Sequence, residues 1–173
     1  MEALAKAAGV EALIKAYCGE DVTLAETGLS ITRPGGGGLE YHADGRAGEC
    51  TVIMSVDDLP PEMGKLGVIL GSHEALDRDT SEDFDAEILE VVEREEREAR
   101  ENQNAGKVSY AYRAGQPIVF DARTLHAAEG SSVGVKVGDE EEGQQEEDGE
   151  GERQETTPKG YRVILWWIYN GVG

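Results

Sequence analysis

Several residue types that would assign this chain to a specialised class are scarce. It has two cysteines in 173 residues, too few for a disulfide framework, which predicts a reducing compartment and, together with the lack of a signal peptide, an intracellular and cytoplasmic location. Lysine and arginine number 16 against 36 aspartate and glutamate, so a basic surface for nucleic acid is absent. We find no apolar run long enough for a membrane span and no secretory signal at Met1–Lys6. The 39% hydrophobic content predicts one soluble domain over residues 1–173.

The excess of acidic residues is concentrated in two segments. Residues 79–101 contain eleven acids and three arginines, and residues 139–155 contain ten acids and one arginine, which together give -17 of the net charge of -20. The first segment has apolar residues at helical spacing, which predicts a helix over about Ser81–Asn102 in an acidic insertion at 79–107. The second has nothing to bury, so 133–158 is predicted to be a disordered loop insertion.

The rest of the chain is predicted to be mainly β. An amphipathic helix is predicted over Glu2–Tyr17, with Leu4, Leu13 and Ile14 towards the core. Short apolar segments separated by glycine and proline then predict a β-sandwich or barrel. The predicted strands are Val22–Glu26, Leu29–Thr32, Glu40–His42, Thr51–Val56, Lys65–Ile69, Val108–Tyr112, Pro117–Phe120 and Tyr161–Tyr169.

Three residues have the composition of a mononuclear iron site. His42 and Asp44 lie two positions apart, so in a strand their side chains would share one face. His126 ends an apolar run, Gln116–His126, which predicts that it faces a cavity at a strand end. Two imidazoles and one carboxylate can occupy one face of an octahedron and leave positions for substrate and O₂. A histidine and an aspartate at this spacing also occur together by chance in exposed loops, so the surrounding motifs decide.

Those motifs resemble the phytanoyl-CoA dioxygenase family of Fe(II)/2-oxoglutarate oxygenases, from about Leu29 to Tyr169. Ile31–Gly36 before Tyr41–Asp44 is similar to the strand, glycine-rich bend and metal motif of that family. Glu62–His73 is similar to its segment ending in Pro-Gly-Ser-His, with leucine in place of proline, and Ala114–Ala128 to the stretch with the distal histidine. Several matches in the right order are more specific than any one of them.

The resemblance implies a double-stranded β-helix, or jelly roll, of the cupin-like type, and a set of site residues. His42, Asp44 and His126 would be the catalytic iron ligands. Arg162 would bind the far carboxylate of 2-oxoglutarate through two parallel hydrogen bonds, and Thr32 would also contact this cosubstrate. Arg162 lies 36 residues after His126, which is longer than is usual in the family, and removing 133–158 restores the usual spacing.

The activity implied by the resemblance is hydroxylation of a small organic substrate with O₂, which releases succinate and CO₂, with ascorbate as an optional reductant. Two alternatives stay open. The chain could be a non-catalytic jelly-roll module that binds a metal or ligand, since Ala128 replaces a serine found in some relatives. It could also be an interaction protein whose acidic segments recruit a basic protein partner.

Deletion of residues 133–158 separates the enzyme from the acidic adaptor. We expect the shortened enzyme to keep 2-oxoglutarate turnover, measured as succinate release, because the deletion removes only the loop and restores the usual spacing. An adaptor would instead lose its basic partner in a pull-down, and loss of both turnover and fold would contradict the assignment of this segment as a surface insertion.

Overall fold

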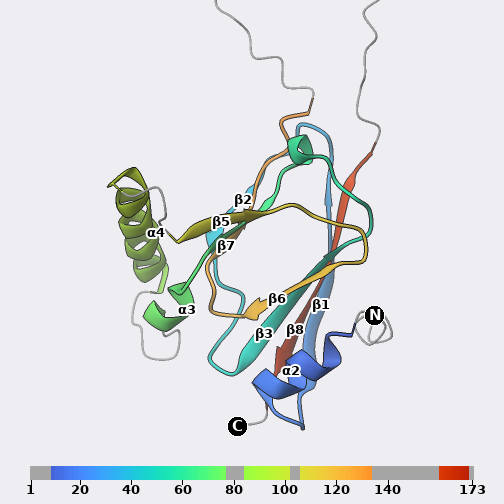
Figure 1. Ribbon diagram of the computed structural model, residues 1–173, viewed down its shortest axis with the longest axis vertical. Helices are drawn as coiled ribbons and strands as arrows, with labels where there is room; N and C mark the ends of the chain where they lie inside the picture. Colours follow the sequence, from blue (N-terminus) through green and yellow to red (C-terminus); the bar gives the residue numbers. More distant parts are fainter. Residues whose placement is uncertain (1–8, 77–83, 102–105, 134–159, 172–173) are drawn as a thin grey trace, which may run out of the picture.

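Two four-stranded antiparallel sheets form the body of the molecule (Figure 1). The structure, a computed structural model, describes residues 9–76, 84–101, 106–133 and 160–171. Sheet A contains, in spatial order, β1 (Thr23–Thr32), β8 (Arg162–Asn170), β3 (Glu49–Ser55) and β6 (Pro117–Asp121). Sheet B contains β2 (Leu39–His42), β7 (His126–Ala128), β4 (Leu66–Ile69) and β5 (Lys107–Tyr110). The short helices are α2 (Glu11–Cys18), η1 (Pro61–Met63) and α3 (Ser72–Ala75), and a longer one is α4 (Phe84–Glu101).

β8 is the organising strand of sheet A, because it pairs with β1 on one side and β3 on the other. Its side chains alternate between the two faces of the sheet. Trp166 lines a cavity between the sheets, whereas Trp167 is fully buried in the cluster on the outer face. The two consecutive tryptophans therefore lie on opposite faces of sheet A.

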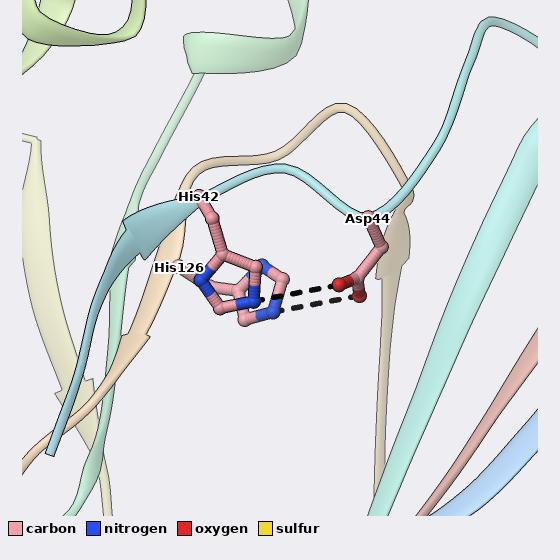
Figure 2. A group of neighbouring side chains, drawn as sticks. All are labelled: His42, Asp44 and His126. Carbon is pink, nitrogen blue, oxygen red and sulfur yellow. Dashed lines mark ion pairs between the residues drawn. The ribbon is translucent and has the colours of Figure 1, made fainter. Parts of the chain in front are cut away.

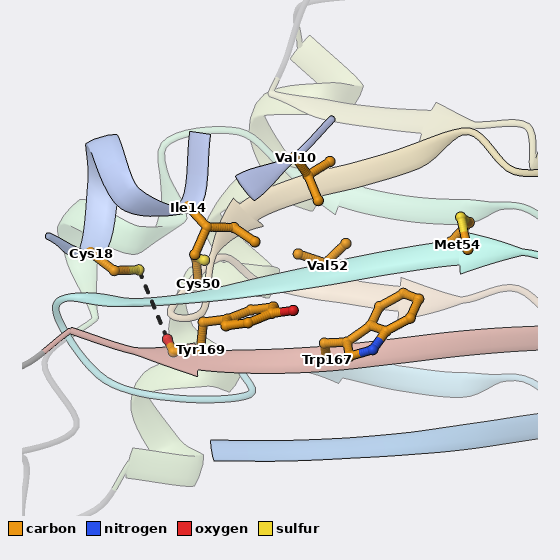
Figure 3. Close-up of a cluster of buried hydrophobic side chains, with 8 residues drawn as sticks. All are labelled: Val10, Ile14, Cys18, Cys50, Val52, Met54, Trp167 and Tyr169. Atoms are coloured by element: carbon orange, nitrogen blue, oxygen red, sulfur yellow. Dashed lines mark hydrogen bonds between the residues drawn. The ribbon is translucent and has the colours of Figure 1, made fainter. Parts of the chain in front are cut away.

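Helix α2 covers the outer face of sheet A. Ile14 and Cys18 of this helix, together with Val10, pack on β3 and β8 around Trp167 (Figure 3). The helix ends where the Gly19 N–H donates to the Lys15 carbonyl at 2.9 Å, with glycine at a positive φ of 98° that few other residues tolerate. Ile14 is buried as predicted.

The prediction that Leu13 faces the core is wrong, because Leu13 is 60% exposed. The helix begins at Glu11 among the described residues, and Val10 occupies the core position instead. Leu4 and the predicted helix start at Glu2 lie outside the described residues.

Helix α4 lies beside sheet B, on the side away from sheet A (Figure 1). Val91 is buried against Ile69 and Leu125, while Leu89 is 62% exposed. The helix falls within the predicted range, whose two ends, Ser81 and Asn102, are outside the described residues. Residues 134–158 of the predicted loop insertion are also outside them, but Val133, its first residue, is buried.

Within the described part of the chain, no helix is long and apolar enough to cross a membrane.

Two strand predictions are wrong in an informative way. Val22–Glu26 and Leu29–Thr32 form one continuous strand, β1, paired with β8 along its length. Gly28 does not break this strand, because its missing side chain makes room for the indole of Trp166. The short strand β7 was not predicted, because its three residues are too few to show an alternating pattern.

The contact between Gly28 and Trp166 gives a stability prediction. In Gly28→Ala the new methyl group would overlap the indole ring, so we expect the free energy of unfolding to fall by about 1–3 kcal/mol. Gly37→Ala is the matched control, because a methyl group there meets nothing within 4 Å. Urea denaturation measures both variants, and equal stabilities would show that the ring moves away without cost.

Candidate metal centre

Strand pairing in sheet B brings the two histidines side by side. His42 ends β2 and His126 begins β7, and the two residues are direct cross-strand partners. Their ring centroids lie 4.3 Å apart. Val68 of β4 is the partner of His126 on the other side, so His126 is held in the middle of the sheet, and its side chain is buried.

Backbone carbonyls fix the orientation of both imidazoles. Nδ1 of His42 lies 2.8 Å from the carbonyl oxygen of Glu40, and Nδ1 of His126 lies 3.0 Å from that of Thr124. A carbonyl can only accept, so each Nδ1 must carry a hydrogen. In a neutral ring the Nε2 atom is then left with a lone pair, and this is the atom that a metal ion binds.

Asp44 completes the group from the loop after β2. Its carboxylate oxygens lie 3.5 Å from Nε2 of His42 and 3.4 Å from Nε2 of His126 (Figure 2). Its backbone N–H donates to the Ala122 carbonyl at 2.9 Å, and Thr51 of β3 donates its hydroxyl to Oδ2 at 2.8 Å. The carboxylate is thus anchored to sheet A, while the imidazoles belong to sheet B.

The three groups perturb one another's pKa values. Hydrogen bonding to Asp44 raises the pKa of His42 against the opposing effect of burial. Burial lowers the pKa of His126, and the charge of a protonated His42 lowers it further. Burial opposes ionisation of Asp44, but its contacts with the two imidazoles and Thr51 outweigh burial and lower its pKa. The arrangement therefore favours an ionised Asp44 beside a His42 that is protonated more readily than usual and a His126 that stays neutral.

This donor set fits a divalent iron ion. One donor atom from each of His42, Asp44 and His126 lies within 4.8 Å of the others, and this is the only such group found among the described residues. Two lone pairs and a carboxylate that face one another repel unless a proton or a metal cation lies between them. Two imidazoles and a carboxylate on one side of an ion match the facial arrangement of non-haem iron sites.

The structure brings together Arg162 and Thr32, both predicted from the sequence as cosubstrate ligands, and Arg162 lines the same cavity as the triad. Arg162 is buried and donates from Nη1 to the carbonyls of Met63 and Glu129, at 2.8 and 2.7 Å. Its Nη2 donates to the Thr32 hydroxyl at 3.0 Å. Two of its five N–H donors have no partner among the described residues, so the guanidinium is held rigidly with two donors left for a ligand.

The cavity joins these groups and is mostly apolar. Its volume is about 390 Å³, within the range of small-molecule sites. Burial raises the pKa of Tyr112, which lies beside Arg162, to about 12, so its hydroxyl stays neutral. Besides His42, Asp44, His126, Arg162 and Tyr112, the lining residues are Glu26, Ser30, Leu39, Ala43, Ile53, Leu66, Ala128, Ile164, Trp166 and Ile168.

Comparison with known proteins shows the family of this chain. The model of the phytanoyl-CoA dioxygenase (PhyH) family matches residues 3–134, which is most of the chain. The chain belongs to the phytanoyl-CoA dioxygenase family. The matched region contains His42, Asp44 and His126 but ends before Arg162, so the family match by itself does not cover the arginine. None of the curated protein sequences compared with the chain matches it.

Solved structures share the fold at low identity. The non-heme alpha ketoglutarate dependent carbocyclase SnoK from nogalamycin biosynthesis has a TM-score of 0.61 at 15% identity, covering 95% of this chain and 56% of its own. The epimerase SnoN from the same biosynthesis has 0.59 at 19%, covering 98% and 57%. EctD from S. alaskensis, solved with 2-oxoglutarate and 5-hydroxyectoine, has 0.57 at 19%, covering 92% and 48%. This family member therefore spans about half the length of these structures.

Two details of the predicted iron site are corrected by the structure. The run Gln116–His126 is not one strand: β6 ends at Asp121, a turn follows, and His126 begins β7 in the other sheet. An ion pair between Arg123 and Asp121, at 2.8 Å, lies in this turn. Asp44 lies beyond the end of β2, so a loop rather than strand alternation directs it to His42.

Thr51 is the site residue that the sequence did not reveal. Its hydroxyl is buried and holds Oδ2 of Asp44, but a threonine inside an apolar strand has an ordinary composition for β structure. Only its partner, which is seven residues away in sequence and on a different element, distinguishes it.

The Thr51 hydroxyl gives a prediction for metal affinity. Groups that orient metal ligands typically change affinity by about 10–100-fold, so we expect Thr51→Val, which keeps the shape but removes the hydroxyl, to weaken Fe(II) binding by about that factor. Anaerobic titration calorimetry measures it, and Thr51→Ser should restore most of the affinity. Unchanged affinity in the valine variant would mean that the backbone alone positions Asp44.

Proposed function

We propose that His42, Asp44 and His126 bind Fe(II), that Arg162 and Thr32 bind 2-oxoglutarate, and that the protein hydroxylates a small organic substrate. The single observation that carries this proposal is the orientation of the two imidazoles. Each Nδ1 is tied to a backbone carbonyl, and each Nε2 is turned towards one oxygen of the Asp44 carboxylate. Family membership supports the same assignment.

The chemistry of the site residues supports an oxygenase. Three protein ligands on one side of the ion leave positions for other ligands. Bound iron would use O₂ and 2-oxoglutarate to oxidise a C–H bond, with release of succinate and CO₂. The protein contributes binding and orientation: the rigid guanidinium of Arg162 offers two unused donors to a carboxylate, and Thr32 steadies the guanidinium.

The arrangement of the sheets also supports the finer fold assignment. We propose that sheets A and B form the double-stranded β-helix, with the chain crossing between them at every connection except that from β4 to β5. Helix α4 would be an insertion between β4 and β5, since these strands pair directly with each other. All of these elements would belong to one domain.

The two alternatives are less well supported by the described residues. A non-catalytic module has no need for an arginine with two unused donors in the same cavity as three metal donors. An acidic adaptor would bind its partner through the acidic segments only. That function would not explain the geometry of His42, Asp44 and His126. Hydroxylation is therefore the function that uses all of these features.

Anaerobic titration with Fe(II) and 2-oxoglutarate tests the proposal. Chelation of the iron by the keto acid should give a visible metal-to-ligand charge-transfer band, and His126→Ala should abolish the band. Arg162→Lys keeps the positive charge but loses the planar fork, so we expect the band to form with half-saturation at about tenfold higher 2-oxoglutarate.

Each variant needs a check of its fold by circular dichroism, because Arg162 also binds two backbone carbonyls. Absence of the band in folded wild-type protein would contradict the proposal. A band that persists at full strength in folded His126→Ala would contradict the assigned ligand.

A further inference from the structure

One charged side chain of the cavity wall is not used by the proposed iron and 2-oxoglutarate sites. Glu26 on β1 lines the cavity, and within the described part of the chain its carboxylate has no hydrogen bond or ion pair. The remaining uncharged polar lining comes from Ser30 and Tyr112. A carboxylate without a protein partner at the wall of a ligand cavity is available to a ligand.

The register of sheet A places Glu26 close to the triad. Glu26 is paired with Ile168 of β8, and Ile168 is paired with Thr51 of β3. Thr51 holds the Asp44 carboxylate. The backbones of Glu26 and Thr51 are thus two strand spacings apart, about 10 Å, and Glu26 and Asp44 both line the cavity. A molecule anchored at Glu26 can therefore reach the triad with a short carbon skeleton.

Glu26 and Arg162 lie far apart along the paired strands β1 and β8. Arg162 is paired with Thr32 at one end of β8, and Ile168 is paired with Glu26 six positions further on, roughly 20 Å along the strand. The cavity therefore has a positive charge at one end and a negative charge at the other. A dianionic cosubstrate is attracted to the Arg162 end, and a cationic ligand is attracted to the Glu26 end.

The wall between these charges suits an organic cation. Trp166 lies two positions from Ile168 and lines the cavity, and its indole rests against the backbone of Gly28, which fixes the position of the ring. Indole faces attract ammonium groups, and the surrounding isoleucine side chains accept an apolar skeleton. The net charge of -20 also favours the approach of cations over anions.

We propose that the substrate is a small organic amine whose ammonium group binds between Glu26 and the indole of Trp166. Its carbon skeleton extends past Ile168 towards the triad, where a C–H bond is hydroxylated. The reaction step rests on the proposed function, but the ammonium site does not, because Glu26 and Trp166 belong to the cavity wall whether or not iron is bound.

The test uses two probes of the same shape, 3-phenylpropan-1-amine, which is protonated at neutral pH, and 3-phenylpropan-1-ol. Ligand-observed NMR titration measures both dissociation constants, first on the metal-free protein and then anaerobically with Fe(II) and 2-oxoglutarate. For the wild-type protein we expect the amine to bind about tenfold more tightly than the alcohol, as for a partly exposed ion pair assisted by an aromatic ring. Glu26→Gln should abolish this preference and leave the affinity for the alcohol unchanged.

Glu20→Gln is the matched control, because it removes the same charge from an exposed position that does not line the cavity, and it should keep the preference for the amine. Equal affinities of the wild type for the two probes, no binding of the amine up to its solubility limit, or a preference that survives Glu26→Gln would overturn the proposal. A solvated edge-strand acid would give the first of these results.

The two proposals fail separately. A charge-transfer band with no preference for the amine would leave the oxygenase standing and remove the ammonium site. A preference for the amine that depends on Glu26 in the metal-free protein, without a charge-transfer band, would leave a cation-binding cavity and remove the oxygenase.

Discussion

The hydrogen bonds from two histidine Nδ1 atoms to backbone carbonyls are the constraint on which the site depends. Because His42 and His126 are cross-strand partners, and each ring is tied to a carbonyl two residues before it in the chain, their Nε2 atoms are presented on the same side. Asp44 meets them from a loop that Ala122 and Thr51 hold against sheet A. The three donors therefore require both sheets, and a change in the spacing of the sheets would separate the imidazoles from the carboxylate.

The alternation of side chains along two strands gives the cavity opposite charges at its two ends. Alternation along β1 and β8 turns Glu26, Thr32, Arg162 and Trp166 to the same face. The positions of opposite charge on this face are set by distance along the strands, which would keep the two proposed ligands, one anionic and one cationic, at opposite ends of the cavity. Arg162 is buried, so its contacts are strengthened by the low local dielectric, whereas Glu26 lies at an exposed position.

Much of the architecture could be predicted from local pattern, and the errors have identifiable causes. Seven of the strands in the described residues overlap a predicted segment, because alternation and turn residues are local signals. β1 was divided in two because Gly28 looks like a break until its packing against Trp166 is known. β7 is too short to show a pattern, and Leu13 was placed in the core although Val10 takes that position.

The sequence by itself determined the identities of the candidate ligands, since His42, Asp44, His126, Arg162 and Thr32 stand in motifs whose order and residue types limit the chemistry. Only the tertiary structure decided which atoms face one another. Pairing between strands far apart in the chain places Thr51 beside Asp44. It also places Glu26 and Arg162 towards different ends of the cavity. Such pairing depends on the packing of the whole core, which no local pattern encodes.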